Sequence, residues 1–176
     1  MNVFSDRIQK LAESETIAMS QKSRDLKALG HDVINLSLGE PDFNTPEVIK
    51  NAAIQAVKDN VSHYTPVPGL VEVRKAIAAK LKRDNDLEYS MDQIVVSTGA
   101  KQSLMNTVLC LVNPGDKVVV ATPYWVSYKE MIGFAEGHMI EVQAGVEQDF
   151  KITPEQLDAH LDQDTKLFMF SSPSNP

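Results

Sequence analysis

The sequence has a single cysteine, Cys110, which excludes an internal disulfide and is typical of a reducing compartment. No stretch approaches about 18 uncharged apolar residues, so no membrane-spanning segment is predicted. Residues 1–10 lack the uninterrupted apolar core of a secretory signal, and a cytoplasmic protein is expected. The 17 Lys and Arg against 24 Asp and Glu give a net charge of −7, which argues weakly against nucleic acid or an anionic membrane as partners.

Metal binding and cysteine chemistry are also not expected. The histidines show none of the spacings typical of metal ligands, so no metal site is predicted at His31, His63, His138 or His160. Cys110 lies in an apolar helical stretch and is interpreted as an inert core residue.

From about residue 93 onward, short apolar runs alternate with amphipathic stretches in a regular rhythm. Strands are predicted over residues 93–97, 117–121, 138–142 and 166–171. Helices are predicted between them over residues 100–112, 126–135 and 154–161. Strands that alternate with helices imply an α/β fold with a mainly parallel sheet and right-handed crossovers.

The first part of the chain lacks this rhythm. Helices are predicted over residues 14–29 and 70–83, with a short β-prone run over residues 32–37. Another helix is predicted to begin with Thr45 as its cap and Pro46 at its first position. The apolar face of that helix is predicted to be buried and to comprise Val48, Ile49, Ala52, Ala53, Ala56 and Val57.

Three segments that follow predicted strands carry residues suited to ligand binding. Thr98-Gly99-Ala100-Lys101 leads into a helix, whose N-terminal N–H groups favour a phosphate, although an ordinary tight turn has the same appearance. Trp125, the one tryptophan, is either a core aromatic or a flat surface that stacks on a ligand ring. Asn175 is either a turn residue or a ligand contact. Because all three follow strands at one edge of a parallel sheet, together they indicate a site there.

Five motifs strengthen this interpretation. They are NLSLGEPDFNTP at residues 35–46, HYTPVPG at 63–69, STGAKQ at 97–102, TPYWVSY at 122–128 and SPSNP at 172–176. In this order they resemble the class I aminotransferases, which are pyridoxal-5′-phosphate enzymes, and most of all the bacterial aspartate and prephenate aminotransferase group. The resemblance covers essentially the whole chain. It implies a three-layer α/β fold of the aspartate aminotransferase type, with helices on both faces of a mainly parallel sheet that is incomplete here.

The resemblance also implies a set of cofactor contacts. Gly99, Ala100 and Lys101 would form the turn whose main-chain N–H groups bind the phosphate of pyridoxal 5′-phosphate. Trp125 would stack on the pyridine ring, and Asn175 would hydrogen-bond the ring hydroxyl.

Substrate and subunit contacts follow from the same resemblance. Gly39 would lie beside the substrate α-carboxylate, and Lys101 would meet the side-chain carboxylate of an acidic amino acid or 2-oxo acid. Trp125 and Asn175 would also border the substrate. Tyr64 would reach the cofactor phosphate of the other subunit, which implies a homodimer.

The residues that the family uses for the reaction itself are not matched in this chain. The Schiff-base lysine of the family lies in its second half, so no catalytic residue is assigned and the 176 residues alone are expected to be inactive. The chain is interpreted as an N-terminal part of the enzyme, with an N-terminal arm and small-domain segment at residues 1–45 and the first part of the large cofactor-binding domain at 46–176. The alternatives are an inert truncated or split fragment, and a lyase or synthase built on the same fold.

Overall fold

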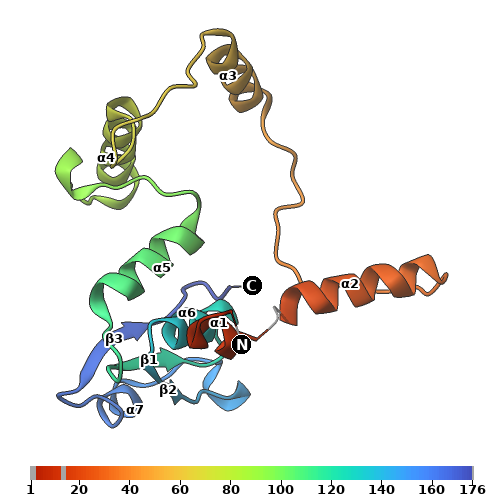
Figure 1. Ribbon diagram of the computed structural model, residues 1–176, viewed down its shortest axis with the longest axis vertical. Helices are drawn as coiled ribbons and strands as arrows, with labels where there is room; N and C mark the ends of the chain where they lie inside the picture. The colour runs from red at the N-terminus through yellow and green to blue at the C-terminus, as the bar shows by residue number, and fades with distance from the viewer. Residues whose placement is uncertain (1–2, 13–14, 176) are drawn as a thin grey trace. The chain divides into compact units, whose positions relative to one another are not determined.

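The computed structural model describes residues 3–12 and 15–175 (Figure 1). The chain forms two compact units. One, here called the sheet unit, comprises Met1–Glu40 and Leu104–Pro176, and the other, the helical unit, comprises Pro41–Ser103. No helix among the described residues is long and apolar enough to cross a membrane.

The elements follow one another with short connections after residue 100. In the sheet unit lie α1 (Asp6–Lys10), α2 (Glu15–Ala28), β1 (Lys117–Ala121), α6 (Ser127–Phe134), β2 (His138–Val142), η2 (Val146–Gln148), α7 (Pro154–Asp158) and β3 (Thr165–Met169). In the helical unit lie α3 (Glu47–Lys58), α4 (Val71–Asn85) and the 3₁₀ turn η1 (Met91–Gln93). The division between the units falls within α5 (Ala100–Leu111).

The sheet has the strand order β2-β1-β3, and β1 pairs in parallel with both neighbours. The three central residues of β1, which are Val118, Val119 and Val120, are fully buried, as is expected of a parallel strand that is covered on both faces. β1 and β2 match the predicted strands in both bounds, and β3 begins one residue earlier and ends two residues earlier than predicted. The predicted α/β class with a parallel sheet is therefore confirmed.

One hydrophobic cluster joins the sheet to its helices. It combines Val108 and Val112 from the α5 side with Val118 and Val120 of β1, and α6 covers it with buried side chains. Burial of each such side chain contributes roughly 1.5–3 kcal/mol relative to exposure, so this cluster is the main stabilising feature of the sheet unit.

Polar contacts fix the amino end of the sheet. The ammonium group of Lys117, at the start of β1, contacts the carboxylate of Asp162 in the turn before β3. This hydrogen bond raises the pKa of Lys117 and lowers the pKa of Asp162, because it joins the charged forms of both groups. The backbone N–H of Lys117 also donates to the carbonyl of Asp164 at 3.2 Å, so the two strands start in a fixed register.

The helical unit is organised by one buried arginine. Arg74 of α4 is 9% exposed, and its Nη1 donates to the carbonyl of Met91 in η1 at 3.0 Å. Beyond η1, Ile94 is buried, and the N–H of Val96 donates to the carbonyl of Pro68 at 3.0 Å. These contacts hold the segment that precedes Gly99 against the start of α4.

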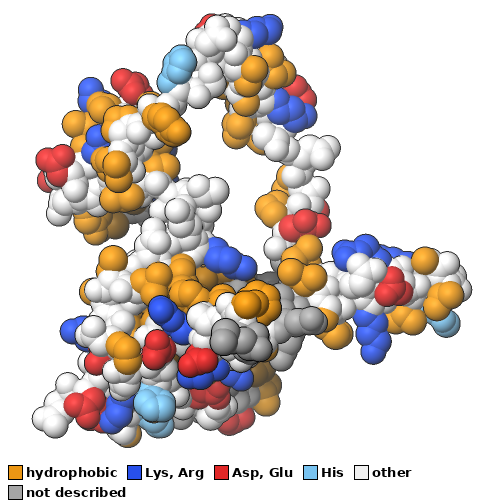
Figure 2. All heavy atoms as spheres, viewed as in Figure 1, with side chains coloured by type: hydrophobic (Ala, Val, Ile, Leu, Met, Phe, Trp, Pro, Cys, Tyr) orange, Lys and Arg blue, Asp and Glu red, His pale blue; other side chains and the backbone are white. Residues whose placement is uncertain are grey.

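Two predictions for the first half of the chain are wrong in detail. α3 begins at Glu47 with Pro46 as its N-cap and without a side-chain cap, so Thr45 does not cap it. No residue of α3 is buried, although its apolar face was predicted to be; Val48 and Val57 are 75% and 78% exposed. An apolar helix face is buried only against a complementary surface, and the described chain leaves this one open (Figure 2).

The strand predicted over residues 93–97 is also absent. Ser90 and Gln93 form a capping box at the 3₁₀ turn Met91–Gln93. Residues 94–97 belong to no helix and to no strand ladder in the described chain. A β-prone sequence forms a strand only when another strand pairs with it. Residues 32–37 are likewise without a strand.

The predicted helices are otherwise found, with adjusted ends. α7 ends at Asp158 rather than near residue 161, and α2 begins at Glu15, while residue 14 lies outside the described residues. Cys110 is exposed, which corrects its interpretation as a core residue. It follows buried Val108 by two positions, about 200° around the helix, and therefore points away from the cluster.

Gly69 provides a test of the helical unit. Its φ is +100°, and a Cβ placed there would lie 2.7 Å from Cγ2 of Val96. We expect Gly69→Ala to lower the free energy of unfolding by about 1–3 kcal/mol, because it combines a left-handed backbone with overpacking. The measurement is denaturant unfolding followed by far-UV circular dichroism.

The matched control is Gly133→Ala. Gly133 lies within α6, and a Cβ there would meet nothing within 4 Å. Alanine has the higher helix propensity, so this variant is expected to be as stable as the wild type or more stable. Equal destabilisation by both substitutions would contradict the close contact of Gly69 with Val96.

Candidate functional site

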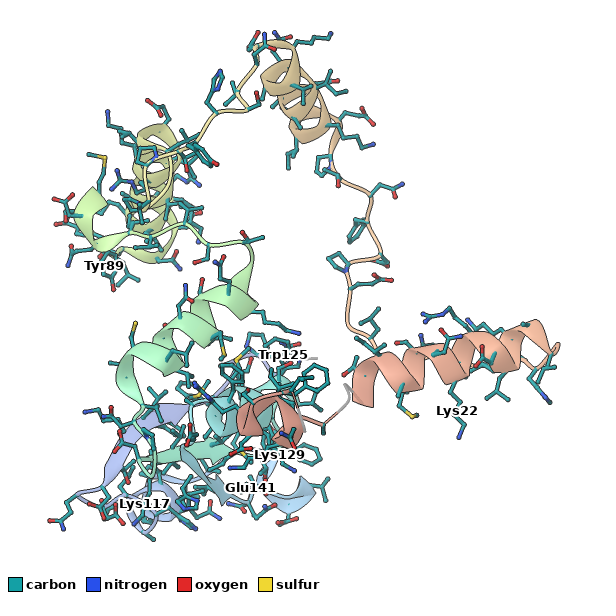
Figure 3. All side chains as sticks on the ribbon, viewed as in Figure 1. Lys22, Tyr89, Lys117, Trp125, Lys129 and Glu141 are labelled. Atoms are coloured by element: carbon teal, nitrogen blue, oxygen red, sulfur yellow. The ribbon has the colours of Figure 1, made fainter. Side chains whose placement is uncertain are left out.

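The loops that follow β1 and β3 leave the sheet at the same edge. Val120 of β1 is in register with Met169 of β3, and the strands run parallel, so both carboxyl ends lie together. The loop after β1 carries Trp125 (Figure 3). The loop after β3 carries Asn175. This edge is where open parallel sheets bind their ligands.

Trp125 is held against the core but is not enclosed by it. Its indole packs on the edge of the buried Tyr128 ring, with 5.9 Å between centroids and 83° between planes. The N–H of Tyr128 donates to the carbonyl of Trp125 at 2.9 Å. Trp125 is half-buried, so it packs on the core as one interpretation predicts and keeps accessible surface as the other requires.

Two polar residues that sequence reasoning missed contact the same loop. Glu141 near the end of β2 accepts a hydrogen bond from the hydroxyl of Tyr124 at 2.8 Å, and the amide of Gln143 contacts Glu141 and Thr122. The signal available in the sequence is that both residues lie at or just after the carboxyl end of a predicted strand. Neither residue belongs to a motif, and their partners depend on which strands are neighbours.

Asn175 lies in an exposed loop. Within it, the hydroxyl of Ser171 donates to the carbonyl of Pro173 at 3.2 Å, and the peptide bond before Pro173 is cis, as is the one between Thr122 and Pro123. Asn175 itself is exposed, so its amide is available to a ligand at this edge. Pro176, the last residue of the motif, lies outside the described residues.

The predicted phosphate turn lies in the helical unit. Gly99 has φ +80°, which is a conformation that favours glycine, and a Cβ there would meet nothing within 4 Å. The next residue, Ala100, starts α5, and the side-chain oxygen of Gln102 accepts a hydrogen bond from the N–H of Thr98 at 2.5 Å. Ala100 and Lys101 are exposed. An open glycine turn at the start of a twelve-residue helix suits an anion chemically.

The remaining predicted site residues lie in irregular segments. Tyr64 is fully exposed and lines a shallow hollow with Ser62 and His63 in the helical unit. Gly39 is exposed in a segment of the sheet unit without helix or strand. The predicted site residues are thus divided between the two units. The sheet unit contains Trp125, Asn175 and Gly39, and the helical unit contains Tyr64, Gly99, Ala100 and Lys101.

A metal centre has no support in the part of the chain that the structure describes. No group of three His, Cys, Asp or Glu side chains among residues 3–12 and 15–175 is placed to hold an ion.

Known proteins are similar to this chain in both sequence and fold. The family described as "Aminotransferase class I and II" matches residues 31–176. The "Probable aspartate/prephenate aminotransferase" of Rhizobium leguminosarum bv. phaseoli is 49% identical over 176 residues, which are 100% of this chain and 44% of that protein. The "Aspartate/prephenate aminotransferase" of Cereibacter sphaeroides is 47% identical over the same 176 residues and the same shares of both chains.

A solved structure agrees with these relatives. The aspartate aminotransferase from Thermus thermophilus with maleate superimposes with a TM-score of 0.94 at 39% identity, over 100% of this chain and 46% of that one. This chain therefore has the fold of the matching part of that protein. It spans less than half the length of the relatives it matches.

Proposed function

Because this chain belongs to the class I and II aminotransferase family, we propose that it is part of a pyridoxal-phosphate-dependent aminotransferase for acidic substrates. The observation that carries the proposal is the placement of Trp125 and Asn175. They follow two neighbouring parallel strands and share one sheet edge, in a chain of this family. The proposal covers the longer protein, because the chain spans 44% of its relatives.

The residues present fit the cofactor chemically. The open turn at Gly99, with Ala100 and Lys101 at the start of α5, offers backbone N–H groups and a helix dipole to a phosphate. Trp125 offers an indole surface to the pyridine ring, and Asn175 offers an amide to the ring hydroxyl. When bound, pyridoxal phosphate supplies an electron sink for the carbon that exchanges its amino group.

In this proposal, the chain's own residues orient the cofactor and select the substrate. Trp125 excludes water from the ring that it covers, and Asn175 fixes the ring hydroxyl. Lys101 places a cation for the distal carboxylate of an acidic substrate, and Gly39, with no side chain, leaves room for the α-carboxylate. Two relatives are named for aspartate and prephenate, and maleate, found with another, is also a dicarboxylate.

The bond-making lysine of the reaction is proposed to lie outside these 176 residues. Lys101 sits in the turn that the family uses for phosphate, so we assign it to binding and not to covalent catalysis. A lyase or synthase on the same fold is the runner-up, and the names of the relatives favour amino transfer. We also propose the arm at residues 1–45, the cofactor domain from residue 46 and a cytoplasmic location, which the single cysteine favours.

Cofactor binding is tested with a pair of glycine variants. We expect Gly99→Ala to weaken the binding of pyridoxal phosphate about five-fold or more, because a non-glycine residue at positive φ costs on the order of 1–3 kcal/mol or changes the turn. Binding of pyridoxal, which has no phosphate, should change little. Equilibrium dialysis gives both affinities, and emission of Trp125 gives a second signal.

Gly115→Ala is the matched control, since Gly115 has φ +87° and equally open surroundings outside the proposed turn. It should leave both affinities unchanged. Equal losses for the two variants would argue against a phosphate at Gly99. The same samples are assayed for amino transfer from aspartate to 2-oxoglutarate, where turnover by the 176-residue chain would show that it contains the bond-making lysine.

Substrate class is tested at Lys101 in the longer protein. A hydrogen bond to a charged group contributes roughly 1.5–3 kcal/mol, so Lys101→Ala should lower kcat/KM for aspartate and glutamate about ten-fold or more. The effect on alanine or phenylalanine should be much smaller. Lys129→Ala, which removes an exposed lysine of α6, is the control. Equal losses on all substrates would assign Lys101 to the cofactor or the fold.

Tyr64 is the basis for proposing a two-fold dimer with shared sites. It is fully exposed in this chain, which is expected of a side chain that completes a neighbour's site. Tyr64→Phe in the longer protein should weaken pyridoxal phosphate binding without lowering the melting temperature. Tyr89→Phe is the control. If analytical ultracentrifugation shows a monomer and that monomer is fully active, the shared site is refuted.

A further inference from the structure

We propose that Glu141 is a positioning residue that holds the Tyr124-Trp125 segment in place for the cofactor ring, an inference that rests on the proposed function. Glu141 lies on β2, outside every motif, and its carboxylate accepts hydrogen bonds from Tyr124 and Gln143. It acts on Trp125 through Tyr124. Figure 3 labels Glu141 and Trp125 in the sheet unit.

A closed ring of hydrogen bonds includes Glu141. Its Oε1 accepts from the hydroxyl of Tyr124 at 2.8 Å, and its Oε2 accepts from Nε2 of Gln143 at 3.1 Å. The Oε1 of Gln143 in turn accepts from the hydroxyl of Thr122 at 3.2 Å. Thr122 and Tyr124 are separated by Pro123 alone, so the backbone completes the ring.

The same ring is anchored to the end of β2. The N–H of Thr122 donates to the carbonyl of Val142 at 3.0 Å, and the N–H of Ala144 donates to the hydroxyl of Thr122 at 3.3 Å. Val142 and Ala144 are buried. The loop therefore starts from a fixed point on the sheet, and Glu141 fixes it again two residues later.

The aromatic rings transmit this restraint to Trp125. The ring of Tyr124 lies nearly parallel to that of Tyr128, with 6.5 Å between centroids and 14° between planes. Trp125 packs on the edge of the same Tyr128 ring. Tyr128 is 5% exposed and belongs to the core cluster. Tyr124 is thus held at its hydroxyl by Glu141 and at its ring by the core, and Trp125 is the next residue.

The carboxylate is chemically suited to this role. A carboxylate accepts two hydrogen bonds at once, one on each oxygen, and hydrogen bonds to a charged acceptor are stronger than those between neutral groups. An amide at this position retains one acceptor oxygen for Tyr124 but carries no charge. Alanine retains none. Glu141→Gln therefore tests the charge, Glu141→Ala removes the acceptor together with its side chain, and Tyr124→Phe removes the hydrogen bond while the Glu141 side chain stays in place.

The experiment compares Glu141→Ala, Glu141→Gln and Tyr124→Phe with the wild-type chain. Trp125 is the sole tryptophan, so its emission maximum and its quenching by acrylamide report on this loop alone. We expect a red shift and stronger quenching in Glu141→Ala and Tyr124→Phe, with Glu141→Gln close to wild type. Affinity for pyridoxal phosphate should fall about three- to ten-fold in the first two variants, as the loss of one hydrogen bond implies.

Glu147→Ala is the matched control, because it removes an exposed carboxylate from η2, outside the ring. Its emission and affinity should match the wild type. Unchanged emission in Glu141→Ala and Tyr124→Phe would overturn the proposal, as would the same change in Glu147→Ala. A change that appears only in proportion to lost helix content in circular dichroism would also overturn it.

Failure of the positioning role differs from failure of the proposed function. If the wild-type chain and the longer protein bind no pyridoxal phosphate while emission responds as expected, Glu141 still holds Trp125 and the cofactor assignment falls. If pyridoxal phosphate quenches Trp125 and binds with the same affinity in the wild type and in every variant, the cofactor assignment stands and the role of Glu141 falls.

Discussion

The parallel pairing of β1 with a strand on each side is the constraint on which the candidate site depends. β1 is hydrogen-bonded along both edges and its three central valines are fully buried. A strand in that position leaves little freedom for its neighbours. Once β2 and β3 are in register with it, the loops after all three strands emerge at one edge, and that edge acquires its aromatic and amide groups together.

Much of the sheet unit is predictable because its patterns are local. The bounds of β1 and β2 follow from short apolar runs between turn residues, and the helices between them from their periodicity. The helical unit is different. Residues 94–97 are as β-prone as a true strand but have no paired strand in the described chain, and the apolar face of α3 has no surface against it. Propensity identifies what a segment can become, and the partner decides the outcome.

The candidate site shows the same division. The loops at Trp125 and Asn175 are marked by their residue types and by the strands before them, and the turn at Gly99 is marked by its glycine and by the helix that follows it. Their resemblance to one family, to which the match over residues 31–176 assigns the chain, is the basis of the roles proposed for them. Glu141 and Gln143 could not be assigned in this way, because their contacts arise from the adjacency of β1 and β2, which the linear sequence does not state.

The unequal exposure of the three strands has a consequence for how this sequence can drift over evolutionary time. β1 has no exposed position. A mutation of any of its valines to a charged or polar residue therefore removes an apolar contact and buries a polar group without a hydrogen-bond partner. β2 exposes His138, and β3 exposes Lys166. Inherited variation should therefore accumulate on the outer strands, and the central strand should keep its short, branched, apolar side chains for as long as the fold persists.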